Sequence, residues 1–125
     1  MLLTTEQAAA KYISDASQIE ICISTLKEPT NTFAILASHD EHYIQTALID
    51  GGFVLEKRLG SADQHFTATH FFRQATQLHK KPWWKFWGQA ETGTCFQESE
   101  VVAAFSAFLS GSPEPTFLRW SRLDL

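Results

Sequence analysis

The sequence predicts an α+β fold in a single domain, residues 1–125, with an antiparallel sheet of five to six strands. A C-terminal amphipathic helix is expected to pack on one face of the sheet, and a short N-terminal helix completes the prediction. Short runs of alternating apolar and polar residues indicate the strands, and the loops between them are too short for parallel crossovers. A length of 125 residues with 44% hydrophobic residues is typical of one globular domain.

The clearest local signal is a β-hairpin between His42 and Gly60, because two runs of β-branched and aromatic residues flank Asp50-Gly51-Gly52. The turn could be Asp50-Gly51 or Gly51-Gly52. Directly opposed residues point to the same side of a sheet, so both registers give one grouping. One face carries Tyr43, Gln45, Glu56 and Arg58, and the other, which we expect to face the core, carries Ile44, Thr46, Leu48, Phe53 and Leu55.

The other elements follow from spacing and capping signals. Thr4 and Gln7 stand in capping-box register and predict a helix that runs to about Ile13, while isoleucines at 19, 21 and 23 alternate with polar residues and predict a strand. Further strands are expected at 32–38, 64–69 and 116–120, with a short one at 92–96 and an ambiguous segment at 71–79. Acidic residues open the best helix, 98–110, and Gly111 ends it.

Charge and motifs exclude several classes of function. The net charge of −4 disfavours nucleic acid as a partner, and the sequence has no 18-residue apolar run and no signal peptide, so we expect a cytoplasmic protein without a membrane partner. Cys22 and Cys95 are expected to be free thiols. No cofactor or catalytic motif is present, and His39 and His42 lack zinc-ligand spacing, so we expect no enzyme, cofactor or metal.

Two histidines flank one predicted strand. His65 and His70 differ by an odd number of residues and should face opposite sides of the sheet. His65 could approach Glu56 or Arg58 across the sheet.

The most distinctive local run is 80–88, in which Trp83, Trp84 and Trp87 alternate with basic residues. These tryptophans either complete the core or form a contact with another protein, since tryptophan is common at binding hot spots.

A resemblance covers residues 42–120. The pattern of Tyr43-Ile44-Gln45, then 52–58 (GFVLEKR), His65-Phe66, 101–105 (VVAAF) and Trp120 is similar to small bacterial α+β proteins that include immunity proteins of interbacterial toxin systems. The resemblance implies a non-catalytic cytoplasmic protein that neutralises a toxin or effector by direct binding. It supplies no toxin-binding position, so the partner-binding residues that we expect come from the hairpin face and the Trp run: Tyr43, Gln45, Glu56, Arg58, His65, Trp83, Trp84 and Trp87.

Two alternatives remain open. One is a small-molecule-binding protein or enzyme with a pocket at the sheet–helix interface that uses Glu56, Arg58 and His65. The other is a homodimeric structural module joined through a sheet edge or the Trp run.

Overall fold

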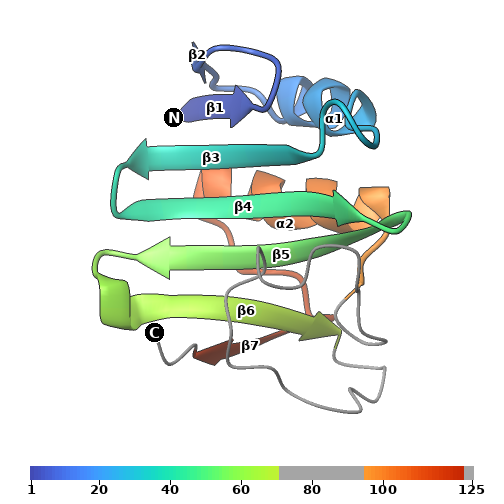
Figure 1. Ribbon diagram of the computed structural model, residues 1–125. Coiled ribbons are helices and arrows are strands. Elements are labelled where there is room, and N and C mark those ends of the chain that lie inside the picture. The colour runs from blue at the N-terminus through green and yellow to red at the C-terminus, as the bar shows by residue number, and fades with distance from the viewer. Residues whose placement is uncertain (71–94, 123–125) are drawn as a thin grey trace.

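The computed structural model describes residues 1–70 and 95–122. These residues form an antiparallel sheet of seven strands in the order β2-β1-β3-β4-β5-β6-β7, together with two α-helices (Figure 1). The strands are β1 (Leu2–Thr5), β2 (Lys11–Tyr12), β3 (Phe33–His39), β4 (His42–Ile49), β5 (Gly52–Leu59), β6 (His65–His70) and β7 (Leu118–Arg122). The helices are α1 (Ala16–Ser24) and α2 (Glu98–Ser110), and a short 3₁₀ turn, η1 (Ala62–Gln64), precedes β6. The α+β class and the antiparallel sheet are confirmed, but the sheet is larger than the five to six strands predicted.

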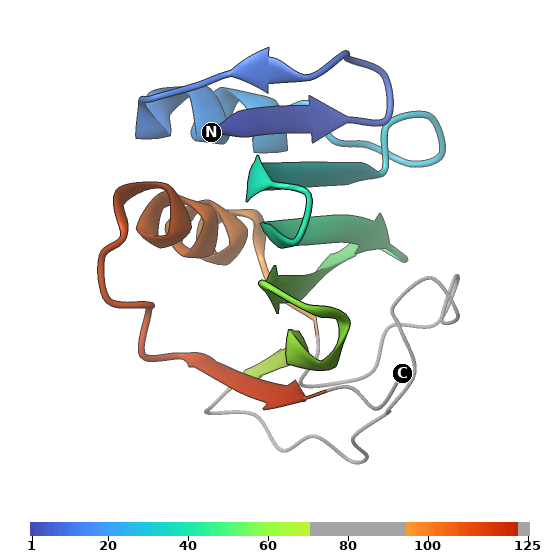
Figure 2. The same cartoon turned by 90° about the vertical axis from the view of Figure 1, so that its left-hand side faces the viewer.

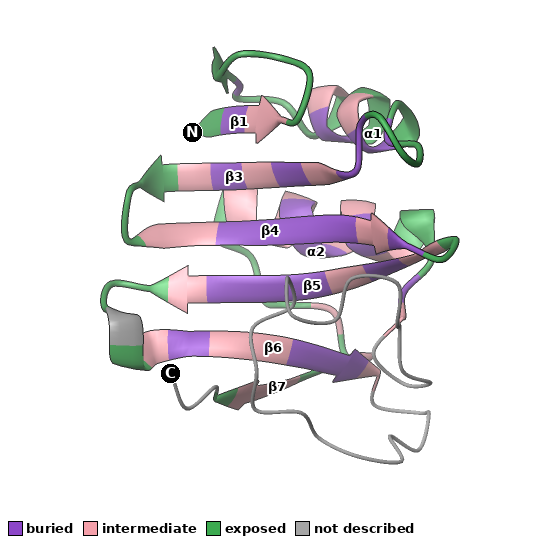
Figure 3. Ribbon diagram, viewed as in Figure 1, coloured by how far each residue is buried: buried purple, intermediate pink, exposed green. Residues whose placement is uncertain are grey.

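Both helices lie on the same face of the sheet (Figure 2). The core is formed between the two layers by residues that lose almost all of their accessible surface: Ile19, Ile23, Leu36, Ile44, Leu55, Val101 and Phe105. The central strands β4 and β5 are buried along most of their length (Figure 3). No helix in the described part of the chain is both long enough and apolar enough to span a bilayer.

The hairpin forms as predicted, with Asp50-Gly51 as its turn. Ile49 pairs with Gly52, and Asp50 and Gly51 both have positive φ, 51° and 79°, as a tight two-residue hairpin requires. The register places Gln45 opposite Glu56 and Tyr43 opposite Arg58. Ile44 and Leu55 join the core with the helices, so the predicted division into two faces is confirmed.

The predicted N-terminal helix is wrong, because this segment is β1, a loop and β2. Gln7, which suggested a capping box with Thr4, instead donates from Nε2 to the carbonyl of Thr30, and its neighbour Glu6 accepts hydrogen bonds from Thr32 at Oε1. β1 then pairs with β3, from Leu2 opposite Ala37 to Thr5 opposite Ala34. Pairing with a sheet edge outweighs the weak helical preference of a few small residues.

The strand predicted around residues 19–23 is also wrong, because these residues form α1. Asp15 caps the helix by accepting from the Ser17 N–H, and Gln18 Oε1 accepts from the Asp15 N–H, which completes a capping box. Ile19 and Ile23, four residues apart, are buried on one side of the helix, whereas Ile21 is 66% exposed. The isoleucines at 19, 21 and 23 therefore do not share one buried face. The strand-like spacing of two residues arose because the exposed Ile21 stands between the two buried ones.

The helix α2 and the strands β3, β6 and β7 agree with prediction. α2 begins at Glu98 and ends at Ser110, and Gly111 closes it in the left-handed conformation with φ 69°. β3, β6 and β7 lie within two residues of the predicted strands. Phe96 makes an isolated bridge with Phe53, while the ambiguous segment 71–79 and the start of the strand predicted at 92–96 lie outside the described residues.

Candidate functional site

Polar side chains from three adjacent strands gather on the face of the sheet opposite the helices, which we call the open face. Strand register brings them together: Gln45 on β4 lies opposite Glu56 on β5, and Arg58 lies between Tyr43 on β4 and His65 on β6. Directly opposed residues in an antiparallel sheet have Cβ atoms about 5 Å apart. These side chains therefore form one group, as the predicted hairpin face and the predicted approach of His65 implied. We call this group the polar cluster: Tyr43, Gln45, Glu56, Arg58 and His65.

The centre of the polar cluster is a buried histidine–carboxylate pair. His65 Nε2 lies 2.5 Å from Glu56 Oε1, and the two residues are 0% and 1% exposed. Gln45 Nε2 donates to the same Glu56 oxygen over 3.4 Å. Glu56 Oε1 already accepts a hydrogen bond from the Gln45 amide, and this favours His65 Nε2 as a second donor to the same oxygen. Nε2 therefore carries a proton in this contact. His65 Nδ1 is then the ring atom directed away from Glu56, and it is buried without a hydrogen-bond partner among the described residues.

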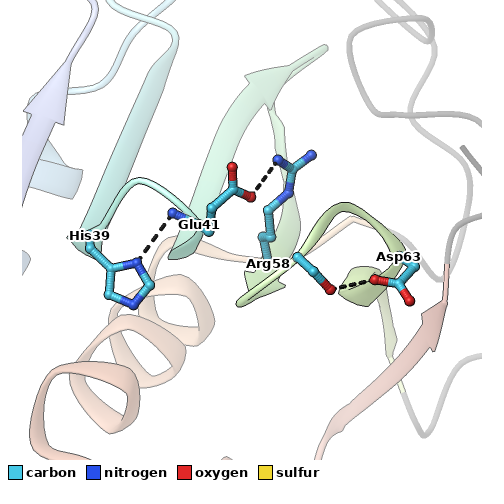
Figure 4. A network of polar contacts seen from close by, with 5 residues as sticks. His39, Glu41, Arg58 and Asp63 are labelled. Atoms are coloured by element: carbon cyan, nitrogen blue, oxygen red, sulfur yellow. Dashed lines mark hydrogen bonds and ion pairs between the residues drawn. The ribbon is translucent and has the colours of Figure 1, made fainter.

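Arg58 and Tyr43 form the outer part of the polar cluster. Arg58 Nη1 lies 3.1 Å from Glu41 Oε2, in an ion pair that reaches from β5 to the turn after β3 (Figure 4). The guanidinium carbon lies 5.8 Å from the centre of the Tyr43 ring, within cation–π range. The Tyr43 ring in turn meets the His65 ring edge-on, with the centroids 6.4 Å apart. Arg58 is therefore oriented by a carboxylate and an aromatic ring.

Burial raises the pKa of the Tyr43 hydroxyl above its usual range. The Glu56 and Glu41 carboxylates raise this pKa further, while the Arg58 guanidinium opposes them. The phenol therefore stays protonated at neutral pH and can donate a hydrogen bond.

Apolar side chains continue the open face beyond the polar cluster. Ala37 lies opposite both Tyr43 on β4 and Leu2 on β1, and Phe33 and Ile35 share this face because they alternate with the core residues Ala34 and Leu36. We call Leu2, Phe33, Ile35 and Ala37 the apolar strip. Leu2 is 40% exposed and the other three are half-buried.

The sequence did not single out this strip. The sequence did contain a sign of it, because the run 32–38 has apolar residues on both faces of the expected strand. Such a run is typical of strands that have apolar surroundings on both sides.

The structure corrects one alternative. Glu56, Arg58 and His65 converge, but they lie on the face opposite α1 and α2 and therefore do not line a pocket at the sheet–helix interface. The hollow between the start of α1 and the end of α2, about 460 Å³, is lined by other residues, among them Met1, Ile13 and Leu109. The expected binding residues Trp83, Trp84 and Trp87 lie outside the described residues.

Two polar contacts on the helix face were not foreseen. His70 faces away from His65, as its odd offset predicted, and its Nε2 lies 2.7 Å from Glu100 Oε2 on α2. Lys57 is buried on the core side, where its Nζ lies 2.9 Å from Glu114 Oε1 and 4.1 Å from the centre of the Trp120 ring. Lys57 is paired with the core residue Ile44 and therefore lies on the core face.

Comparison of the chain with protein-family models, with curated proteins and with solved structures found no match. Within residues 1–70 and 95–122, no three histidine, cysteine or acidic side chains are grouped so that they could hold a metal ion.

Proposed function

We propose that this chain is a non-catalytic protein-binding domain and that the open face is its binding surface. The observation that carries the proposal is that, within residues 1–70 and 95–122, helices cover only one face of the sheet. Both α-helices pack on one face (Figure 2), while the other presents the apolar strip beside Tyr43 and Arg58. Half-buried apolar side chains with an adjacent tyrosine and arginine have the composition of a binding hot spot.

The buried part of the polar cluster supports this surface from below. Gln45, Glu56 and His65 are too deeply buried to provide much contact area, but their hydrogen bonds fix the strands that carry Tyr43 and Arg58. A surface that is already rigid loses little conformational entropy on binding, and this increases affinity. We assign direct contact to Tyr43, Arg58 and the apolar strip, and positioning to the three buried residues.

The partner that we propose is a toxin or effector protein encoded beside this chain, which the domain would neutralise in the cytoplasm by direct binding. The similarity of residues 42–120 to immunity proteins supports this choice. The net charge of −4 favours a basic partner, because opposite charges accelerate association.

Isothermal titration of the purified neighbour protein into the purified domain tests the proposal. We expect a stable one-to-one complex and protection of cells that produce the neighbour. Ile35→Asp places a charge in the apolar strip and should weaken binding by about thirtyfold, the effect of losing a hot-spot contact of about 2 kcal/mol.

Ile21→Asp is the matched control, because Ile21 is exposed on α1 and lies on the helix side of the sheet. It should leave affinity unchanged. The proposal is wrong if the neighbour neither binds nor is neutralised, or if both substitutions have the same effect. A parent protein that is a dimer in light scattering, and that Ile35→Asp converts to a monomer, would assign the open face to self-association instead.

A further inference from the structure

We infer that the polar cluster contains a receptor for a single carboxylate, formed by the guanidinium edge of Arg58 with His65 beside it. This inference rests on the proposed function, since it names the chemistry of the partner group that the open face would take: an aspartate or glutamate side chain.

The first supporting observation is that two adjacent buried nitrogens have no partner. Among the described residues, neither Arg58 Nε nor His65 Nδ1 makes a hydrogen bond. Arg58 and His65 are directly paired on β5 and β6, so both atoms belong to neighbouring side chains on one face. Buried polar atoms in proteins are nearly always hydrogen-bonded, and one that is not needs a functional or structural explanation.

The second observation concerns which edge of Arg58 is in use. Glu41 contacts only Nη1, at 3.1 Å. The opposite edge, which carries the Nε and Nη2 hydrogens, is the edge that binds a carboxylate through two parallel hydrogen bonds. The Arg58 side chain keeps 21% of its accessible surface, although its Nε is buried, so a carboxylate would approach this edge from the exposed part of the guanidinium.

Glu41 shows that this guanidinium already attracts a carboxylate. Its side chain is 50% exposed in the turn between β3 and β4, and it makes one contact where an incoming carboxylate could make two (Figure 4). Glu41 holds one negative charge beside Arg58, so a singly charged ligand that displaces Glu41 from the guanidinium conserves the charge at this position. A phosphate, with up to two negative charges, does not.

Titration with sodium acetate tests the inference without any protein partner. Nitrogen-15 spectra report the Arg58 Nε–H signal and the ring nitrogens of His65, and sodium chloride at equal ionic strength is the reference. We expect a saturable shift of these signals with acetate and no saturation with chloride. Absence of a saturable shift, or an identical response to chloride, overturns the inference.

Variants locate the site. Arg58→Lys keeps the charge but removes the Nε–H edge, so acetate affinity read at His65 should fall at least fivefold, since bidentate recognition cannot be replaced by a lysine ammonium. Arg122→Lys, on the other face of the sheet beside Asp63, should change nothing. Equal acetate affinities in the two variants would overturn the assignment.

Glu41→Gln tests the competing role of Glu41. Removing an exposed ion-pair partner should tighten acetate binding about two- to fivefold. Glu20→Gln, on the exposed side of α1, removes the same charge and should have no effect. Weaker binding in Glu41→Gln would overturn the inference.

The two proposals can fail separately. Acetate binding without a complex with the neighbour protein would remove the proposed function but keep the carboxylate site. A complex sensitive to Ile35→Asp in a protein that does not bind acetate would do the reverse.

Discussion

Glu6 connects the first strand to the start of β3 through one carboxylate oxygen. Its Oε1 accepts hydrogen bonds from the Thr32 N–H at 2.8 Å and from the Thr32 hydroxyl at 2.7 Å. These two hydrogen bonds, the backbone one first, hold the pKa of Glu6 below its usual 4.5, against a smaller opposing effect of desolvation. Hydrogen bonds to a carboxylate favour its charged form.

The lowered pKa predicts how stability depends on pH. The contribution of Glu6 is present above its unfolded pKa of about 4.5 and is lost as the pH falls through the lower folded value. Urea unfolding of the parent and Glu6→Gln should therefore show a stability difference at pH 6 that shrinks at pH 3. Glu20→Gln, at an exposed position of α1, should show no such trend. A difference that is constant with pH would contradict this role of Glu6.

The Glu56–His65 pair predicts a larger effect. Removing one member of a buried ion or hydrogen-bonded pair leaves the other without compensation, so Glu56→Ala should lower the free energy of unfolding by about 3–5 kcal/mol. Glu20→Ala on the surface should change it by less than about 0.5 kcal/mol. Chemical denaturation measures both, and similar small losses would show that the pair is not structurally important.

At the scale of elements, local signals that agreed with tertiary pairing were read correctly from the sequence, and those that conflicted were not. The hairpin turn and α2 needed only the residues within them, from Asp50-Gly51 to the terminal Gly111. The segment around Thr4 was predicted as a helix and is a strand, and the segment around Ile19 was predicted as a strand and is a helix. The strand β1 depends on pairing with β3, some thirty residues away. The polar cluster could be grouped by register alone, whereas the partial exposure of the apolar strip depends on which face the helices cover.

The end of α2 gives a prediction at this scale. Gly111 has φ 69°, and a Cβ added there would meet no atom within 4 Å, so any cost of substitution is conformational. Gly111→Ala should lower the free energy of unfolding by about 1 kcal/mol, and Gly111→Asn by less, since asparagine tolerates the left-handed region. Thermal or urea unfolding of both variants checks the order. A steric cause would instead make the larger asparagine the worse residue.

At the scale of the whole molecule, the described residues form two layers with a core between them, and the two faces of a single strand should therefore respond differently to the same change. Leu36 on β3 is fully buried against the helices, and its neighbour Ile35 is half-buried on the open face. Leu36→Ala should cost about 2–5 kcal/mol, because it leaves a cavity in a packed core.

Ile35→Ala should cost about 1 kcal/mol or less, because a side chain that is already partly hydrated in the native state loses less burial when truncated. The two variants should have the opposite order of effect on binding. Ile35→Ala should weaken the complex with the neighbour protein, whereas Leu36→Ala should leave the affinity of the folded protein unchanged. Urea unfolding and titration of both variants provide the four values needed. If Ile35→Ala proved as destabilising as Leu36→Ala, the open face would be a second core rather than a binding surface, and the division of the molecule into a structural side and a recognition side would be wrong.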